Sequence, residues 1–361
     1  YTAAMKQAIK LAVKGNGYVS PNPRVGAVII KNDEIIAEGW HKEFGAPHAE
    51  VEAINNAGLD SFEGCTLVVN LEPCSHEGKT PPCADLIIEK KFDRVVFGNI
   101  DPNPEVSGQG MAKLVAAGID VISGVLDEEC KWINRFFAKY ITTGLPYIIL
   151  KAAQSLDGCV ATRSGESKWI SSEESRRRSH ALRSEVDAVL IGKKTAAVDN
   201  PFLTVRSVDG RNPKKVVFDT DLTLPLTINT FKDADRNNVI VCCNPKALAT
   251  RKAETLRLAG IEILPVEIND QGTLNIPSAL FALSDLGISS VMVEGGSTLL
   301  SSFVQAQMVD ELHLFIAPKI IGDGLNTFGS FHINYLNEAL YLSLKAVSKS
   351  DSDIHVIAVN N

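Results

Sequence analysis

One nitrogen and two sulfur side chains near the start of the chain have the spacing of a metal site. His48 opens the run HAE, Cys74 follows Pro73, and Cys83 ends the loop PCSHEGKTPPC. Imidazole and thiolate are the ligand types that zinc prefers, and three of them leave a fourth position for water. An open fourth position is typical of a catalytic zinc rather than a structural one.

Glu50 lies on the first turn of an expected helix, two residues after His48. Its carboxylate can face a metal-bound water there without binding the metal. Zinc lowers the pKa of such a water to about 7. We therefore expect hydrolytic deamination of an amidine-like ring carbon, with Glu50 carrying the proton to the departing ammonia. The alternative is a closed structural site with His76 as fourth ligand, although such a site does not need Glu50.

A proline immediately precedes each expected ligand, Pro47, Pro73 and Pro82 in turn. Proline favours the first positions of a helix, and the positive end of a helix lowers the pKa of a nearby thiol. We expect these prolines to place the ligands at helix starts.

The second half carries a glycine turn of the kind that binds phosphate. The strand-like run 289–296 leads directly into STLLSSFV, so Gly295 and Gly296 form a strand-to-helix turn before Ser297 and Thr298. Backbone N–H groups at such a turn can face an anion, and glycine permits close approach. A plain tight turn is the alternative. The dinucleotide fingerprint GxGxxG is absent from this half, which argues against a Rossmann dehydrogenase.

The elements that must position these residues alternate between strand-like and helix-like patterns. In the first half the expected strands are 25–31, 34–40, 65–71 and 93–100, and the expected helices are 48–58, 84–90 and 111–118. The first two strands form a hairpin about the turn KND, and Gly58 ends the first helix. This order predicts a mixed sheet covered by helices on both faces.

The domain boundary is expected near residue 145. Residues 128–145 are typical of a helix and connector, after which Pro146 opens a new strand at 147–153. Further strands are expected at 187–192, 214–219, 238–243 and 289–296, with helical stretches that include 173–184 and 245–260. The second half is thus a second α/β unit.

Composition narrows the classes of function. The chain has 361 residues, which favours two domains at about 150 residues each. Asp and Glu number 43 against 36 Lys and Arg, so the net charge of −7 disfavours a nucleic-acid partner. No stretch resembles a membrane span. Seven cysteines without a secretory leader pattern indicate free thiols in a reducing cytoplasm. The oligomeric state stays open, and a homo-oligomer is allowed.

The first half resembles the cytidine-deaminase superfamily, whose pattern is H-x-E followed by P-C-x-x-C. Here SHEGKTPP separates the two cysteines, and this longer loop is similar to that of the riboflavin-pathway deaminases. The stretches 20–29, 70–83 and 101–104 carry the resemblance. It implies a cytidine-deaminase-like three-layer α/β/α domain over residues 1–145. The substrate contacts that it implies are Asn22, His41, His76 and Lys79.

The second half resembles the dihydrofolate-reductase-like reductases of riboflavin synthesis, in the stretches 150–158, 167–176, 189–206 and 293–299. The resemblance implies an NADPH-binding α/β domain of that fold over residues 146–361. The cofactor contacts that it implies are Ala153, Trp169, Thr195, Asp199, Gly296, Ser297, Thr298, Leu299, Leu300, Ser301 and Ser302. The substrate contacts that it implies are Ser167, Arg183, Leu203, Arg206 and Glu294.

The charged residues of the second half can be sorted on physical grounds. Arginines suit a ribose 5-phosphate because guanidinium binds phosphate through two hydrogen bonds at once. Arg176, Arg177 and Arg178 follow an expected capping box from Ser171 to Glu174, and we expect them on a solvated helix face.

The reduction needs a proton donor as well as the hydride that the cofactor supplies. The ionisable candidates are Lys151, Asp199 and Glu294. We expect Asp199 to act, with Lys151 as its partner. A structural ion pair between these two is the alternative.

Together the two resemblances imply a bifunctional enzyme of riboflavin biosynthesis. The expected reactions are zinc-dependent hydrolytic deamination of 2,5-diamino-6-(5-phosphoribosylamino)pyrimidin-4-one and then NADPH reduction of the ribosyl group to ribityl. Three alternatives are a second half that only senses a ligand, a zinc-stapled scaffold without chemistry, and a tRNA or nucleoside deaminase. The acidic balance disfavours the last of these.

Overall fold

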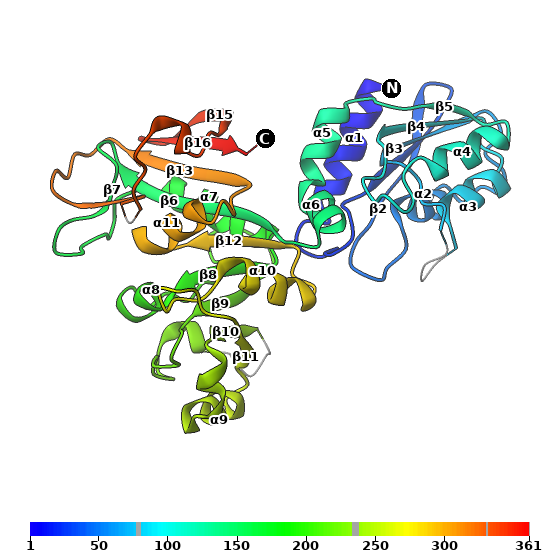
Figure 1. The fold of residues 1–361 in the computed structure, drawn as a ribbon. Coiled ribbons are helices and arrows are strands. Elements are labelled where there is room, and N and C mark those ends of the chain that lie inside the picture. The colour runs from blue at the N-terminus through cyan, green and yellow to red at the C-terminus, as the bar shows by residue number, and fades with distance from the viewer. Residues whose placement is uncertain (77–80, 233–237, 330, 361) are drawn as a thin grey trace. The chain divides into compact units, whose positions relative to one another are not determined.

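The structure is a computed structural model that describes residues 1–76, 81–232, 238–329 and 331–360. It divides into two compact units, Tyr1–Leu145 and Pro146–Asn361 (Figure 1). Each unit combines a sheet with helices packed on it, so the predicted α/β class is confirmed.

The N-terminal unit is built on a mixed sheet in the order β2-β1-β3-β4-β5. Its strands are β1 (Gly26–Lys31), β2 (Glu34–Trp40), β3 (Cys65–Leu71), β4 (Arg94–Asn99) and β5 (Asp120–Ile122). Its helices are α1 (Thr2–Val13), α2 (Ala49–Ala57), α3 (Cys83–Glu89), α4 (Gln109–Ala116), α5 (Asp127–Ile133) and α6 (Arg135–Thr143). β1 runs antiparallel to β2 and β3, whereas β3, β4 and β5 are parallel.

Alternate residues of these strands face two different helix layers, as the pleat of a strand requires. In β1, Ala27 and Ile29 belong to the core that α2, α3 and α4 complete. Val28 between them packs into the core formed with α1 and α5. The sheet is therefore the middle of three layers, which is the architecture expected from the sequence.

The predicted hairpin, first helix and buried strands of this unit are confirmed. Gly58 ends α2 in the left-handed region, at φ 62°. The helix α1 and the short strand β5 were not predicted. The stretch 128–145 is two helices rather than one, because the buried Asn134 between them exchanges hydrogen bonds of 2.8 and 3.1 Å with the backbone of Arg24.

The C-terminal unit has a larger sheet in the order β11-β10-β9-β8-β12-β6-β13-β16-β15, with a small sheet of β7 and β14. The strands are β6 (Tyr147–Ser155), β7 (Cys159–Ala161), β8 (Ala188–Gly192), β9 (Lys214–Phe218), β10 (Val239–Cys243), β11 (Glu262–Pro265), β12 (Ser290–Glu294), β13 (Glu311–Ala317), β14 (Leu325–Asn326), β15 (Ser343–Ser350) and β16 (Asp353–Val359). The helices are α7 (Glu173–Glu185), α8 (Lys193–Val198), α9 (Arg251–Leu258), α10 (Ile276–Asp285) and α11 (Ser297–Gln305), with 3-10 turns η1 (Asn229–Phe231), η3 (Pro245–Ala249) and η4 (Leu336–Glu338).

The order of strands changes direction around β12. The chain runs outward through β8, β9, β10 and β11, returns to place β12 between β8 and β6, and continues on the other side of β6. β6 and β8 both run parallel to β12, so the carboxyl ends of these three strands lie at the same end of the sheet. Such a switch point in a parallel sheet is where ligands of α/β proteins bind.

The start of α7 differs from the prediction. Its N-cap is Ser172, whose Oγ accepts a hydrogen bond of 3.2 Å from the backbone N–H of Ser175. The expected capping box from Ser171 to Glu174 is therefore wrong by one residue. The Glu174 carboxylate instead binds the guanidinium of Arg177.

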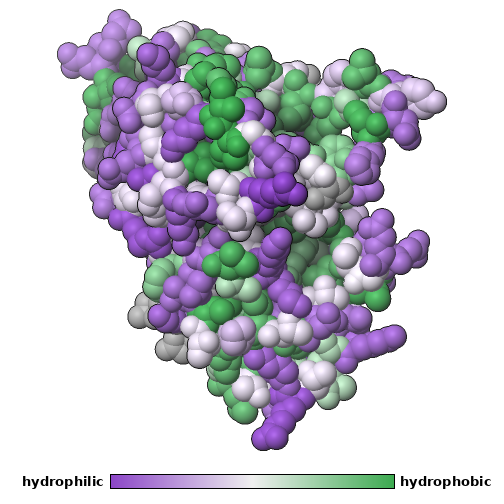
Figure 2. Space-filling model, turned by 90° about the vertical axis from the view of Figure 1, so that its left-hand side faces the viewer, coloured by the Kyte–Doolittle hydropathy of each residue, from purple (hydrophilic) through white to green (hydrophobic). Residues whose placement is uncertain are grey.

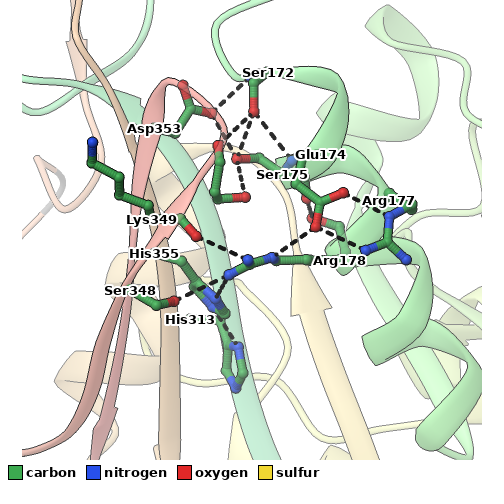
Figure 3. Close-up of polar contacts among 12 residues, drawn as sticks. Ser172, Glu174, Ser175, Arg177, Arg178, His313, Ser348, Lys349, Asp353 and His355 are labelled. Carbon is green, nitrogen blue, oxygen red and sulfur yellow. Dashed lines mark hydrogen bonds and ion pairs between the residues drawn. The ribbon is translucent and has the colours of Figure 1, made fainter.

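The N-terminal half of α7 is tied to the hairpin of β15 and β16 by several polar contacts (Figure 3). The Asp353 carboxylate accepts 2.7 Å hydrogen bonds from the Ser172 backbone and from Ser175 Oγ. Arg178 donates to the backbone carbonyl of Lys349 at 2.8 Å. A solvated face was expected here, and it holds for Arg177, whose side chain is 53% exposed, but not for Arg178.

The described part of the chain contains no helix long and apolar enough to cross a membrane. The face drawn in Figure 2 mixes hydrophilic and hydrophobic residues and does not present one continuous apolar surface.

Candidate active sites

His48 and Glu50 are positioned by the first turn of α2. His48 is the N-cap residue of this helix, with extended backbone angles of φ −69° and ψ 161°. Glu50 lies on the first turn, and only 4% of its surface is exposed. A helix that starts at Ala49 therefore turns both side chains toward the same buried point.

The three expected zinc ligands come together. The Nδ1 atom of His48 lies 3.6 Å from Cys74 Sγ and 3.3 Å from Cys83 Sγ, and all three donor atoms fall within 4.8 Å of one another. Zn–N and Zn–S bonds of about 2.1 and 2.3 Å at tetrahedral angles give N to S separations of about 3.5 Å. The donor set thus fits zinc in both chemistry and spacing.

The alternative of a closed zinc site gains no support from the described residues. His76 is exposed and lies outside the cluster that the other three ligands form. Among the residues that the structure describes, no fourth His, Cys, Asp or Glu joins this cluster. Lys79, an expected substrate contact, lies outside the described residues.

The two cysteines are held differently from one another. Cys83 is the first residue of α3 after Pro82, as expected, but Cys74 lies in a loop after β3 rather than at a helix start. The backbone N–H of Cys83 nevertheless donates to Cys74 Sγ at 3.3 Å. Hydrogen bonds from the Cys83 thiol, the His48 ring and this amide outweigh burial and lower the pKa of Cys74. A thiolate is the form that binds a metal.

Burial raises the pKa of Glu50 to about 7, an effect that the positive charge of nearby His48 opposes. A carboxyl group with a pKa close to the working pH can both take up and release a proton. The position and the environment of Glu50 therefore suit general acid–base work.

Asn22 and His41 lie beside the zinc ligands. The His41 ring is buried and meets the His48 ring edge to face, with centroids 5.7 Å apart. Its Nδ1 lies 3.1 Å from the carbonyl oxygen of Pro47, so Nδ1–H donates and Nε2 can accept from the Asn22 amide at 3.2 Å. Burial lowers the pKa of His41, which favours this neutral form.

The C-terminal unit contains a cavity of about 2670 Å³ at the carboxyl ends of β6, β8 and β12. The expected cofactor and substrate residues that line it are Lys151, Ala153, Ser167, Trp169, Arg183, Thr195, Asp199, Leu203, Arg206, Glu294, Gly296, Ser297, Thr298, Leu299 and Ser302. Leu300 and Ser301 do not line the cavity, because both are buried at the other side of α11. The sequence pattern could not distinguish the two sides of this short helix.

The glycine turn after β12 packs against α8. Gly296 donates its backbone N–H to Thr195 Oγ1 at 3.3 Å and serves as the N-cap of α11. Gly295 has φ 155°, and a Cβ atom at this position would lie 3.3 Å from Thr195 Oγ1. The backbone angle favours glycine here, and a Cβ would also make a tight contact with Thr195 Oγ1.

Three charged side chains that line the cavity, Lys151, Arg183 and Glu294, form an ion cluster. The Arg183 guanidinium binds both carboxylate oxygens of Glu294, at 2.6 and 2.8 Å. Lys151 Nζ lies 3.8 Å from the same carboxylate. The ion pair of Lys151 is thus with Glu294, so the alternative of a structural ion pair between Lys151 and Asp199 gains no support.

Burial alone would raise the pKa of Glu294, but the charges of Arg183 and Lys151 reverse the effect and lower it to about 2. Burial lowers the pKa of Lys151, while Glu294 raises it and Arg183 lowers it further. An ammonium group in these surroundings releases its proton more readily than one in water.

Trp169 stands at the cavity wall with 66% of its surface exposed. The guanidinium of Arg176 lies over its ring, 4.6 Å from the centroid, and Arg176 also lines the cavity. The expected solvated face therefore does not hold for Arg176. A cation over an aromatic ring is a favourable contact.

Comparisons with known proteins agree with this division of the chain. Residues 1–99 match the family model of the cytidine and deoxycytidylate deaminase zinc-binding region, and residues 146–356 match that of the RibD C-terminal domain. The riboflavin biosynthesis protein RibD of Aquifex aeolicus is 42% identical over 97% of this chain and 96% of its own length. The chain belongs to the RibD family.

Other members of the RibD family are similar to this chain over nearly their whole length. RibD of Bacillus amyloliquefaciens is 40% identical over 98% of this chain and 95% of its own. The crystal structure of Acinetobacter baumannii RibD has a TM-score of 0.88, with 35% identity over all of this chain and 98% of its own. A Thermotoga maritima structure, described as a diaminohydroxyphosphoribosylaminopyrimidine deaminase and 5-amino-6-(5-phosphoribosylamino)uracil reductase, has a TM-score of 0.87, with 41% identity over all of this chain and 99% of its own.

As a member of the RibD family, the chain is a bifunctional deaminase and reductase of riboflavin biosynthesis. It is both a hydrolase and an oxidoreductase, with a zinc-binding deaminase domain and an NADPH-dependent reductase domain.

Some residues near the RibD sites were not assigned to a site by the sequence analysis. Glu72, which precedes the Pro-Cys pair, accepts hydrogen bonds of 3.1, 3.0 and 2.9 Å from the backbone of Asp101, Gly108 and Met111. It thereby ties the stretch that begins at Asp101 to the zinc loop. In the reductase half, Arg176 and His180 line the cavity although the sequence places them on a helix rich in charge.

Proposed function

We propose that residues 1–145 deaminate 2,5-diamino-6-(5-phosphoribosylamino)pyrimidin-4-one and that residues 146–361 then reduce the ribosyl group of 5-amino-6-(5-phosphoribosylamino)uracil with NADPH. The observation that supports this proposal is the placement of two separate groups of reactive side chains, one in each compact unit. The description of the similar Thermotoga maritima protein supplies the two substrates.

In the deaminase half, His48, Cys74 and Cys83 would hold the zinc ion. When bound, zinc supplies a water molecule of lowered pKa. The buried Glu50 carboxylate would serve as the proton carrier, holding a proton and delivering it to the leaving amino group. Asn22, His41, His76 and Lys79 are proposed to contact the substrate, and the contact between Asn22 and His41 beside His48 supports the first two.

In the reductase half, the cavity residues orient the substrate against the cofactor. Ser167, Arg183, Leu203, Arg206 and Glu294 are the proposed substrate contacts, and the cofactor contacts are those implied by the resemblance. The Arg183 guanidinium already donates two hydrogen bonds to the Glu294 carboxylate. Arg206 is therefore better placed to bind the phosphate. NADPH supplies the hydride when bound. Asp199 and Lys151 are the proposed donors of the proton, and both line the cavity.

The proposed partners are small molecules, without a nucleic acid or a membrane. All seven cysteines are free in the structure, which supports a reducing cytoplasm as the location. A homo-oligomer remains compatible with these sites.

The proposal is tested by incubating the protein with the diaminopyrimidine substrate, with and without NADPH, and by measuring product masses. Without NADPH we expect only exchange of an amino group for oxygen. With NADPH the product should also gain hydrogen at the ribosyl group, and NADPH should be oxidised only when substrate is present. Absence of either mass change would contradict the corresponding assignment.

A further inference from the structure

The segment 199–206 forms one wall of the reductase cavity without being part of a sheet. Asp199, Leu203 and Arg206 line the cavity from this segment. Residues 201–206 adopt no helix or strand, and Leu203 has a left-handed φ of 56°. Something other than a strand ladder must therefore hold this backbone in place.

Side chains of α7 supply the missing backbone partners. Arg183 Nη1 donates to the carbonyl oxygen of Thr204 at 3.2 Å, and the backbone N–H of Arg206 donates to His180 Nδ1 at 3.3 Å. In an extended chain, the C=O of residue i and the N–H of residue i+2 point to the same side. One turn of α7 thus takes the place that a neighbouring strand would occupy.

The opposite side of the same segment is held as well. The backbone N–H of Val205, between the two bonded groups, donates to Asn212 Oδ1 at 2.7 Å. Three consecutive residues, 204 to 206, thus each have one backbone group bound by a side chain. The backbone from which the Arg206 side chain leaves is therefore fixed from both sides.

Arg206 is the arginine of this region best placed for an anion. The partners of Arg183 are the Glu294 carboxylate and the Thr204 carbonyl. The guanidinium of Arg206 lines the cavity and donates to the Thr204 hydroxyl at 2.9 Å. An arginine has five N–H donors, so most of those of Arg206 can still bind a phosphate.

His180 must be neutral to accept the Arg206 N–H. Its ring is buried, with 8% of its surface exposed, and the charges that face it are Arg183 on α7, Arg206 on the wall and Glu294 on β12. Burial, followed by the two arginines, lowers the pKa of His180 to about 4. The neutral ring is thus the form present near neutral pH.

We propose that His180 is a positioning residue of the reductase half, which fixes the backbone at Arg206 so that this guanidinium meets the phosphate of the substrate. The identity of that substrate rests on the proposed function. His180 acts through Arg206 and need not touch the reacting atoms.

The test compares His180→Asn with His180→Gln. An Asn amide oxygen can occupy the place of Nδ1 and keep the acceptor, whereas the longer Gln side chain carries its oxygen to the place of Nε2. We expect His180→Gln to raise the KM for 5-amino-6-(5-phosphoribosylamino)uracil about tenfold, the equivalent of one lost hydrogen bond of about 1.4 kcal/mol, with a smaller change in kcat. His180→Asn should stay close to the wild-type KM.

A double variant tests the route through Arg206. When Arg206→Ala is already present, His180→Gln should raise KM no further, because the group that it positions is gone. Circular dichroism and cooperative unfolding of the isolated variants report that the reductase unit is folded. An equal rise of KM in the Asn and Gln variants, or an undiminished effect of His180→Gln beside Arg206→Ala, would overturn the proposal.

Binding of ribose 5-phosphate, measured by calorimetry, separates this inference from the proposed function. The dissociation constant should rise about tenfold in His180→Gln and stay near the wild-type value in His180→Asn. If the wild-type protein failed to reduce the uracil compound but kept this binding pattern, the proposed substrate would be wrong and the role of His180 would stand. Equal binding by both variants would overturn the role of His180.

Discussion

The zinc cluster shows how a few side chains can define a chemistry before the fold is considered. An imidazole and two thiols lie within 4.8 Å of one another, and a buried carboxyl group follows on the same helix turn as the imidazole. The carboxyl group distinguishes this cluster from a purely structural zinc site, because a metal held only for stability needs no proton carrier.

Replacing one thiol should remove the metal. We expect Cys83→Ala to lose most of the zinc bound per chain and with it the deaminase activity, because two remaining ligands hold zinc poorly. Metal analysis of the purified protein is the measurement. His76→Ala is the matched control, since His76 lies outside the cluster. Full zinc in Cys83→Ala, or loss of zinc in His76→Ala, would show that the ligand set is wrong.

At the level of helices and strands, α7 joins two parts of the reductase unit. Its first turn holds the hairpin of β15 and β16 through Asp353 (Figure 3). Its last turns hold the cavity wall and Glu294 through His180 and Arg183. The stability of the hairpin and the shape of the cavity therefore depend on the same helix.

Breaking the link at the hairpin should lower stability. Asp353 is 2% exposed and accepts two short hydrogen bonds, so Asp353→Ala removes the acceptor of the Ser172 N–H and one of the two acceptors near Ser175 Oγ. We expect a loss of about 1–3 kcal/mol in the free energy of unfolding, measured by chemical denaturation. Asp323→Ala, which breaks an ion pair with both side chains more than four-fifths exposed, should cost less than about 1 kcal/mol. Equal losses in both variants would contradict the structural role of Asp353.

The sequence predicted elements well where hydrophobic periodicity was plain. The hairpin β1–β2, the helix α2 ended by Gly58 and the strands β3 and β4 follow from their patterns alone. The antiparallel end of the larger sheet was not predicted, because the first half of β13 buries Glu311 and His313 while Leu312 between them is only half-buried. This arrangement inverts the pattern by which an amphipathic strand is usually found.

The candidate sites were predictable only where their residues lie close together in the sequence or in a recognisable motif. Residue types and short spacings pointed to His48, Glu50, Cys74 and Cys83. The structure brings the three expected zinc ligands among them together. Partners distant in sequence could not be assigned, since the pairing of Lys151 with Glu294 depends on the neighbouring register of β6 and β12. The contact of His180 with Arg206 likewise depends on a loop that no periodicity describes.

At the scale of the molecule, the two sites lie in two separate compact units, and the boundary between these units falls between Leu145 and Pro146. Each unit has its own sheet and its own set of helices. A unit with its own core can fold alone in principle.

We therefore expect a fragment of residues 146–361 to be soluble, to unfold cooperatively and to reduce the deaminated substrate with a kcat/KM within about tenfold of that of the full chain. Circular dichroism and NADPH oxidation are the measurements. A folded fragment without reductase activity would show that residues 1–145, from the same or another chain, complete the second site.

The central claim is that one chain holds two independent catalytic sites, and product analysis of two variants tests it most directly. With NADPH and the diaminopyrimidine substrate, Glu50→Gln should slow ammonia release by about 10²- to 10⁴-fold, because glutamine cannot carry a proton, while pre-deaminated substrate is still reduced normally. Asp199→Asn should do the reverse, so that the deaminated ribosyl compound accumulates. If either variant lost both reactions while its fold and zinc content stayed normal, two independent sites would be refuted.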